Sequence, residues 1–190
     1  MRRVCEGAAK GQRRNDKIAR KESSIGKFRQ SLRLDLKLNI EQNKISMWHK
    51  IIATVFFIGY CPFAPGTVAS VFAMAILWIF APSKAVILSM LISALILGTI
   101  SSEKMAKESQ SEDPSYVVID EFAGYLTSVA FLPLNWQVLV AGFVLFRFFD
   151  ILKPPPISQA EKIGGGLGIM LDDFLAGIFS NLLIRVFLLL

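Results

Sequence analysis

The sequence predicts an all-α fold: a compact, membrane-embedded bundle of short hydrophobic helices whose polar loops converge on one face. Hydrophobic residues make up 53% of the 190-residue chain and charged residues only 19%, which is more apolar than an average soluble domain. Long uncharged runs fill most of residues 51–190. Proline and glycine interrupt these runs and divide them into helix-length segments. The composition excludes a disordered or collagen-like chain.

Charge divides the chain into two parts. Residues 1–50 carry 14 Lys and Arg against 5 Asp and Glu, a net charge of +9, whereas residues 51–190 carry a net charge of −3. We therefore predict a basic, poorly ordered N-terminal extension over residues 1–47 and a helical domain over residues 48–190. A basic extension suits the anionic surface of a membrane. It contains none of the common nucleic-acid-binding motifs, so we expect no nucleic-acid partner. A targeting role and a translation start at Met47 are both left open.

The uncharged runs are long enough to cross a membrane. They cover 33, 18 and 25 residues over 51–83, 85–102 and 122–146, and the last 17 residues contain a single charge, at Arg185. Apolar runs of about 18 residues or more are candidates for transmembrane helices. The alternative is a set of buried helices in a soluble domain. Because four such runs fill most of the domain, we favour a multi-pass membrane protein.

Helix breakers set the limits of the expected helices. Proline and glycine break the helical pattern in three segments: 61–66, 82–83 and 132–135. Thr67 and the Asp113–Pro114 pair are good helix-starting residues, and we interpret the glycine run 164–168 as a flexible loop. The predicted helices cover residues 67–81, 85–102, 114–132, 136–152 and 171–189.

The turns between these helices bring polar segments together. Asp120 lies 12 residues before Leu132 and Arg147 lies 12 residues after Asn135, so each is about 18 Å of helix from the turn between them. Both therefore return to the same level of the bundle. The turn near Pro82 acts in the same way on the segments before and after it. We expect three stretches to share one face: residues 61–66, 103–121 and 147–173.

Histidine and cysteine offer almost no chemistry in this chain. The only histidine is His49, and the two cysteines, Cys5 and Cys61, match neither a disulfide framework nor a zinc-binding pattern. Neither cysteine has an arginine six positions later, which excludes the Cys-x5-Arg phosphatase loop. Any catalysis must therefore use carboxylates, hydroxyls, Arg or Lys.

Two adjacent acid pairs, Asp120–Glu121 and Asp172–Asp173, each lead into an apolar helix. Burying such carboxylates without a partner is costly, and Mg²⁺ prefers carboxylate oxygens. We therefore predict that Asp120, Glu121, Asp172 and Asp173 bind Mg²⁺. A solvated helix face is the alternative for the first pair, and a glycine loop with a capping acid is the alternative for the second.

Basic residues lie near these acids. Arg147, Asp150 and Lys153 are spaced three apart and can pair along one side of a helix, or the two cations can bind phosphate. The free backbone N–H groups near Thr67, at a helix start, also suit phosphate. We assign phosphate binding to Arg147, Lys153 and Thr67, and catalytic roles to Asp120, Asp150 and Asp172. This combination suits metal-assisted attack on a phosphate ester.

Four blocks of unusual residues occur in order over about residues 48–190. They are Ala64-Pro65-Gly66-Thr67 with Ser70; Asp120-Glu121-Phe122-Ala123-Gly124; Phe146-Arg147-Phe148-Phe149-Asp150 with Lys153-Pro154 and Pro156-Ile157; and Gly165-Gly166-Leu167-Gly168-Ile169-Met170 with Asp172-Asp173 and Ala176-Gly177. Together they resemble the bacterial phosphatidylglycerophosphatase A family. The family often has an Asp shortly after its Lys-Pro-x-Pro-Ile block, where this chain has Glu161.

The resemblance implies a small, all-helical, Mg²⁺-dependent lipid phosphatase. Such an enzyme hydrolyses the terminal phosphate monoester of phosphatidylglycerophosphate to give phosphatidylglycerol, at the lipid bilayer of the bacterial inner membrane. A membrane ion transporter using the same carboxylates is the main alternative, and a structural membrane subunit is a third. A CDP-alcohol phosphatidyltransferase does not fit, because the chain lacks an Asp-Gly-x2-Ala-Arg block.

Overall fold

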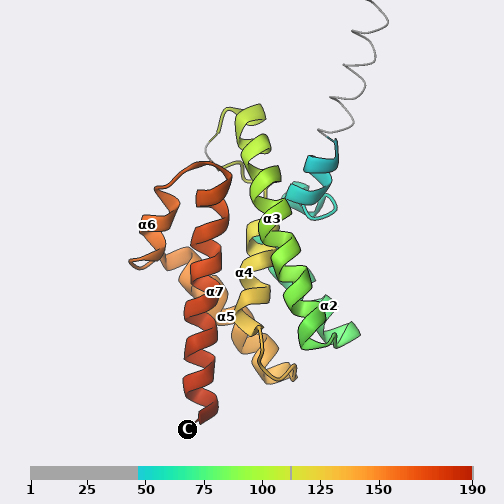
Figure 1. Ribbon diagram of the computed structural model, residues 1–190, viewed down its shortest axis with the longest axis vertical. Coiled ribbons are helices and arrows are strands. Elements are labelled where there is room, and N and C mark those ends of the chain that lie inside the picture. The colour runs from blue at the N-terminus through green and yellow to red at the C-terminus, as the bar shows by residue number, and fades with distance from the viewer. Residues whose placement is uncertain (1–46, 112, 190) are drawn as a thin grey trace, which may run out of the picture. The chain divides into compact units, whose positions relative to one another are not determined.

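The computed structural model describes residues 47–111 and 113–189, and every regular element in these ranges is a helix (Figure 1). In chain order they are a helix over residues 47–53, η1 (Ile58–Tyr60), α2 (Pro65–Phe80), α3 (Lys84–Ser109), α4 (Ile119–Val129), α5 (Trp136–Leu152), α6 (Ile157–Glu161) and α7 (Gly165–Leu189). The all-α prediction is confirmed. The predicted basic extension lies outside the described residues, apart from Met47.

Helix α4 lies at the centre of the bundle. It packs against α2, α3, α5 and α7 (Figure 1), and ten of its eleven residues are buried. The remaining residue, Glu121, is partly buried. Because Asp120 and Glu121 lie in the first turn of α4, this buried central helix carries two carboxylates into the interior.

Glycines let α4 and α7 pack with their backbones in contact. A Cβ atom added to Gly124 would overlap the Phe146 ring and crowd the carbonyl oxygen of Asp173, and one added to Gly177 would overlap the carbonyl oxygen of Gly124. Only small residues permit helices to approach so closely. The contact fixes Asp173 of α7 beside the first turns of α4.

The C-terminal end of α4 is held by side chains of α7. The Asn181 amide nitrogen lies 3.1 Å from the carbonyl oxygens of Thr127 and Ser128 and 3.0 Å from that of Ala130. Arg185 donates to the Asn181 side-chain oxygen at 2.7 Å and to the Ala130 carbonyl at 3.3 Å. The last carbonyls of a helix have no partner within it, so α7 satisfies the end of α4 from outside.

The predicted limits hold where local signals set them. Helix α5 covers the predicted residues, and the Asn135 side chain accepts a hydrogen bond from the Val138 N–H at 2.9 Å, as expected of a helix-capping residue. Helix α2 starts at Pro65, two residues before the predicted start. Thr67 therefore lies inside the first turn, and its interpretation as the cap is wrong.

The predicted start of the third helix is wrong. Helix α4 begins at Ile119 and not at Pro114, so Asp113 does not cap it. The preceding segment is fixed by other backbone hydrogen bonds: the Val117 N–H donates to Pro114, and the Val118 N–H donates to the carbonyl of Ala53 at 2.8 Å. This second bond joins residues far apart in the sequence, which local patterns do not reveal.

Helices α3 and α7 are longer than predicted, and the two extensions meet. Helix α3 continues to Ser109, and α7 begins at Gly165, within the glycine run predicted to be a loop. The Glu103 carboxylate accepts a hydrogen bond from the Gly166 N–H at 2.6 Å. It therefore caps the start of α7, where an acid is also favoured by the helix dipole. A Cβ at Gly166 would overlap the backbone of α3, so the close contact between α3 and α7 requires glycine at this position.

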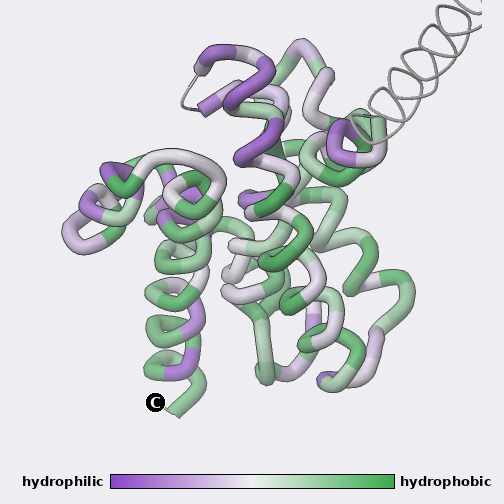
Figure 2. The backbone as a smooth tube through the Cα atoms, turned by 45° about the horizontal axis from the view of Figure 1, so that its top comes forward, coloured by the Kyte–Doolittle hydropathy of each residue, from purple (hydrophilic) through white to green (hydrophobic). Residues whose placement is uncertain are grey.

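Two helices of the described residues, α3 and α7, are long and apolar enough to cross a membrane. Figure 2 shows that hydrophobic residues cover most of the helical tube, with hydrophilic residues gathered toward the end that holds the α3 C-terminus and α6. Large apolar side chains are exposed at the opposite turns, among them Trp78, Phe80, Phe131 and Trp136. Aromatic side chains in such positions are common at membrane–water boundaries.

Replacing Asn181 should destabilise the bundle. The Asn181→Leu variant keeps the volume but removes the three hydrogen bonds from Asn181 to the last carbonyls of α4, of which Ala130 keeps its bond from Arg185. We expect a loss of about 1–3 kcal/mol. Thermal unfolding in detergent measures it, with the exposed neighbour Leu182→Ala as a control expected to change stability by less than about 0.5 kcal/mol. Equal unfolding temperatures for Asn181→Leu and the wild type would contradict this account of the end of α4.

Candidate active site

Three carboxylates from two helices lie together in the interior. Asp120 and Glu121 of α4 and Asp173 of α7 each place one oxygen within 4.8 Å of the others. Asp120 is 8% exposed and Asp173 is 3% exposed. We call these three residues the carboxylate group. The structure brings together three of the four residues predicted to bind metal.

The carboxylate group has the features of a cation site. Asp120 Oδ1, Glu121 Oε2 and Asp173 Oδ2 are buried and lack a hydrogen-bond partner within the described part of the chain. Burial, followed by the negative charges of Glu121 and Asp173, raises the pKa of Asp120 well above its ordinary value. A divalent cation would remove this penalty, and hard cations such as Mg²⁺ prefer carboxylate oxygens. The residues therefore fit Mg²⁺.

Helix α2 contributes its N-terminus to this group. A Cβ on Gly66 would overlap the Glu121 carboxylate, so glycine is the residue that allows α2 to lie so close. The N-terminal end of a helix carries partial positive charge and favours a nearby anion. Thr67 follows Gly66 and is half-buried, but its hydroxyl makes no hydrogen bond with the carboxylate group, to judge from the described residues.

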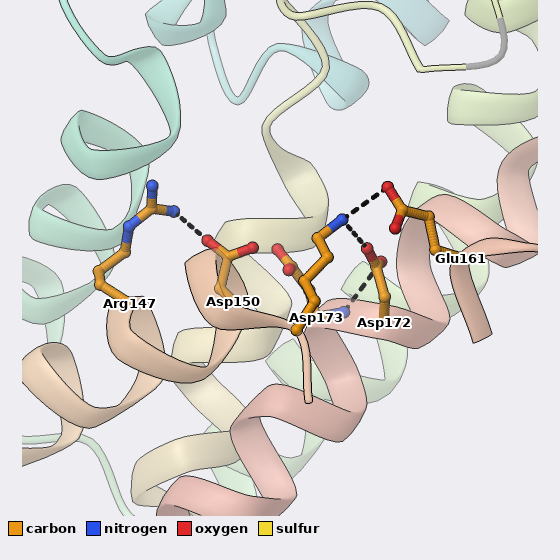
Figure 3. A network of polar contacts seen from close by, with 6 residues as sticks. Arg147, Asp150, Glu161, Asp172 and Asp173 are labelled. Atoms are coloured by element: carbon orange, nitrogen blue, oxygen red, sulfur yellow. Dashed lines mark hydrogen bonds and ion pairs between the residues drawn. The ribbon is translucent and has the colours of Figure 1, made fainter. Parts of the chain in front are cut away.

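Arg147 and Asp150 form an ion pair on α5 beside the carboxylate group. Their side chains are 2.6 Å apart, with 19% and 14% of each exposed, and Figure 3 shows Asp150 between Arg147 and Asp173. The Arg147 Nε has no hydrogen-bond partner in the described ranges. It remains available to donate to an anion. The predicted return of Asp120 and Arg147 to one level of the bundle is confirmed.

Lys153 joins a second pair of acids. Its ammonium donates to Asp172 at 2.7 Å and to Glu161 at 2.9 Å (Figure 3). Burial disfavours the ammonium, but these two hydrogen bonds outweigh burial and raise the pKa of Lys153. Asp172 thus lies with Lys153, outside the carboxylate group. The predicted metal-binding role of Asp172 and phosphate-binding role of Lys153 stay predictions.

A polar cavity of about 100 Å³ lies between these groups. Asp120 and Asp172 both line it, together with Asp113, Glu161, Gly164, Gly165 and Ile169. Asp113 was expected only to cap a helix. Burial raises its pKa, while the charge of Lys153 opposes this change. Sequence spacing could not place Asp113 here, because its position depends on the long-range bond between Val118 and Ala53.

Sequence comparison with known proteins gives independent information on this chain. The family model described as Phosphatidylglycerophosphatase A matches residues 51–188. The chain belongs to the phosphatidylglycerophosphatase A family. The match spans all four sequence blocks and every residue of the carboxylate group. No solved structure matches the chain.

Curated relatives come from several bacteria. A protein of Bacteroides thetaiotaomicron named "Putative phosphatidylinositol-3-phosphatase" is 39% identical over 146 residues, which cover 72% of this chain and 91% of the relative. Phosphatidylglycerophosphatase A of Escherichia coli is 36% identical over 70% of this chain and 78% of the relative. The Haemophilus influenzae protein of the same name is 37% identical over 74% and 90%.

Breaking the pair between Lys153 and Asp172 should destabilise the protein. Asp172 is 6% exposed, so the Lys153→Met variant leaves a buried carboxylate without its cation. We expect a loss of about 1–3 kcal/mol, below the range for fully buried pairs because Lys153 is partly exposed. Thermal unfolding provides the measurement, and the exposed neighbour Lys162→Met is the control.

A double variant separates the pair from other effects. Lys153→Met combined with Asp172→Asn removes both charges, so it should recover part of the stability that Lys153→Met loses. Losses that simply add would show that the two side chains are not coupled.

Proposed function

We propose that this chain is a Mg²⁺-dependent lipid phosphatase that converts phosphatidylglycerophosphate to phosphatidylglycerol at the bacterial inner membrane. The observation that carries the proposal is the carboxylate group, where three buried oxygens have no hydrogen-bond partner among the residues that the structure describes. A paired arginine and a paired lysine lie beside it. Membership of the phosphatidylglycerophosphatase A family supports the substrate, since two relatives bear that name.

Each residue has a role that its position suits. Asp120, Glu121 and Asp173 would hold Mg²⁺, which when bound supplies a Lewis acid for a phosphoryl oxygen. Arg147, oriented by Asp150, offers its free Nε to the phosphate oxygens and would neutralise their charge as the phosphorus–oxygen bond breaks. Asp120 and Asp172 line the polar cavity, where they can orient a water molecule or accept its proton. Lys153 positions Asp172.

The apolar surface supports a location in the bilayer. Helices α3 and α7 have the length and composition of spans, and the exposed apolar side chains on several helices would meet lipid instead of water. We propose a multi-pass protein with the carboxylate group toward one membrane surface, where the headgroup of a phospholipid substrate lies.

The name of one relative refers to a different phospholipid. The Bacteroides protein is named for phosphatidylinositol 3-phosphate, which also carries a phosphate monoester on a phospholipid headgroup. Both lipids offer the carboxylate group the same reacting centre. An assay must therefore compare them directly. Family membership gives no support to the ion-transport alternative.

Phosphate release tests the proposed function. Purified full-length protein in detergent micelles should release phosphate from phosphatidylglycerophosphate with Mg²⁺ and not with EDTA. Asp120→Asn and Asp173→Asn should each lower kcat/KM by at least about 100-fold, because each removes a ligand and a negative charge from the proposed ion site. Glu108→Gln, on α3 and outside the site, is the matched control and should behave as the wild type.

Two results would contradict the proposal. Phosphate release that continues in EDTA would show that the reaction does not need a divalent cation. Faster release from phosphatidylinositol 3-phosphate than from phosphatidylglycerophosphate would assign the chain a different lipid substrate.

A further inference from the structure

A large apolar groove lies beside the carboxylate group. It has a volume of about 420 Å³ and runs between residues 51–56, α2, α3 and α4. Phe72, Met90, Ala94 and Phe122 form much of its wall. The groove reaches the surface, since Leu97 and Phe56 on its wall are 47% and 75% exposed. Its volume lies within the range of small-molecule binding sites.

The wall of the groove selects an apolar occupant. None of its thirteen residues is charged, and only Ser89 and Ser93 carry a polar side chain. The Ser89 hydroxyl donates to the Val86 carbonyl of its own helix at 2.8 Å, so it offers little to a ligand. A polar ligand would lose its hydrogen bonds with water here and gain few in return.

Helix α4 contributes residues both to the groove and to the carboxylate group. Ile119 and Phe122 line the groove and flank Asp120 and Glu121 in the sequence. The rings of Phe122 and Phe72 are 6.5 Å apart. Along α2, Phe72 lies six residues, or about 9 Å, from Gly66, which contacts the Glu121 carboxylate. The separation between the two places is therefore short compared with the length of a phospholipid, which has an anionic head at one end and apolar chains at the other.

A strained turn shapes one wall. Val55, Phe56 and Phe57 have φ angles of 45°, 54° and 70°, in the left-handed region that residues other than glycine rarely adopt. Thr54 holds the turn: its hydroxyl donates to the Lys50 carbonyl at 2.7 Å and accepts from the Phe57 N–H at 3.0 Å. The turn buries Val55 in the groove wall and leaves Phe56 exposed at its rim.

We propose that this groove binds one acyl chain of the phospholipid substrate while the phosphate lies at the carboxylate group. The inference rests on the proposed function and deepens it, because it makes the acyl chain of the lipid a part of what the protein recognises. An acyl chain held here keeps the attached headgroup near the carboxylate group, so KM should be lower for the lipid than for its free headgroup.

Filling the groove tests the proposal. In Ser93→Phe, a ring is added to an exposed wall position of α3. We expect KM for long-chain phosphatidylglycerophosphate in mixed micelles to rise about tenfold. For the water-soluble deacylated headgroup, glycerophosphoglycerol phosphate, kcat/KM should stay within twofold of the wild type. Ala85→Phe is the matched control, since Ala85 is also exposed on α3 but lies outside the groove.

Comparing the long-chain lipid with its deacylated headgroup distinguishes failure of this proposal from failure of the proposed function. If Ser93→Phe lowers turnover of both substrates equally, the variant has damaged the site, and chain binding in the groove is contradicted. Unchanged KM for the long-chain lipid would place the acyl chain elsewhere. Wild-type protein that turns over neither substrate would contradict the proposed function itself.

Photocrosslinking gives a readout that needs no turnover. Phosphatidic acid with a mid-chain diazirine, in mixed micelles, should label residues 51–56 and the groove face of α3, with Met90 among the labelled positions, and Ser93→Phe should reduce this labelling at least fivefold. Labels spread evenly over exposed apolar residues such as Ile96 and Leu182 would mean that the groove meets only bulk lipid, which would overturn the proposal.

Discussion

The close approach of α4 and α7 is the constraint on which the site depends. Gly124 and Gly177 let the two backbones touch, and this contact brings Asp173 to Asp120 and Glu121. A larger side chain at either glycine would push α7 away and separate the acids. The same helix pair is held at its other end by Asn181. The packing of the bundle and the geometry of the carboxylate group are therefore one structural feature.

Bringing three carboxylates together in an apolar interior is unfavourable without positive charge. The protein supplies part of it: Arg147 pairs with Asp150, Lys153 pairs with Asp172, and the α2 N-terminus faces Glu121. None of these places a formal cation within the carboxylate group itself, which keeps three buried oxygens without a hydrogen-bond partner among residues 47–111 and 113–189. Buried polar atoms without partners are rare in folded proteins. A divalent cation is the simplest partner, and it also supplies what phosphate hydrolysis requires.

Sequence reasoning succeeded where local signals decide the structure. The helix breaker at residues 132–135 set the start of α5, and helix geometry then placed Asp120 and Arg147 at one level. It failed where hydrogen bonds between residues far apart in the sequence set the limits of a helix. The bond from Val118 to Ala53 delays the start of α4, and Glu103 caps α7 within a glycine run. Asp113 and the apolar groove were missed for the same reason. Asp172 and Asp173 are adjacent in the sequence, but neighbours on a helix point about 100° apart, and only Asp173 joins the carboxylate group. The metal-binding role of Asp172 stays a prediction.

Direct detection of the ion tests the central claim, that the carboxylate group holds a divalent cation. Mn²⁺ can replace Mg²⁺ at sites of carboxylate oxygens, and its electron paramagnetic resonance signal distinguishes free from bound ion. Purified full-length protein in detergent should bind one Mn²⁺ per chain at the carboxylate group, Mg²⁺ should displace it, and Asp173→Asn should weaken binding at least tenfold while Glu108→Gln does not. Absence of bound Mn²⁺ in folded protein, or equal binding by Asp173→Asn and the wild type, would contradict the account.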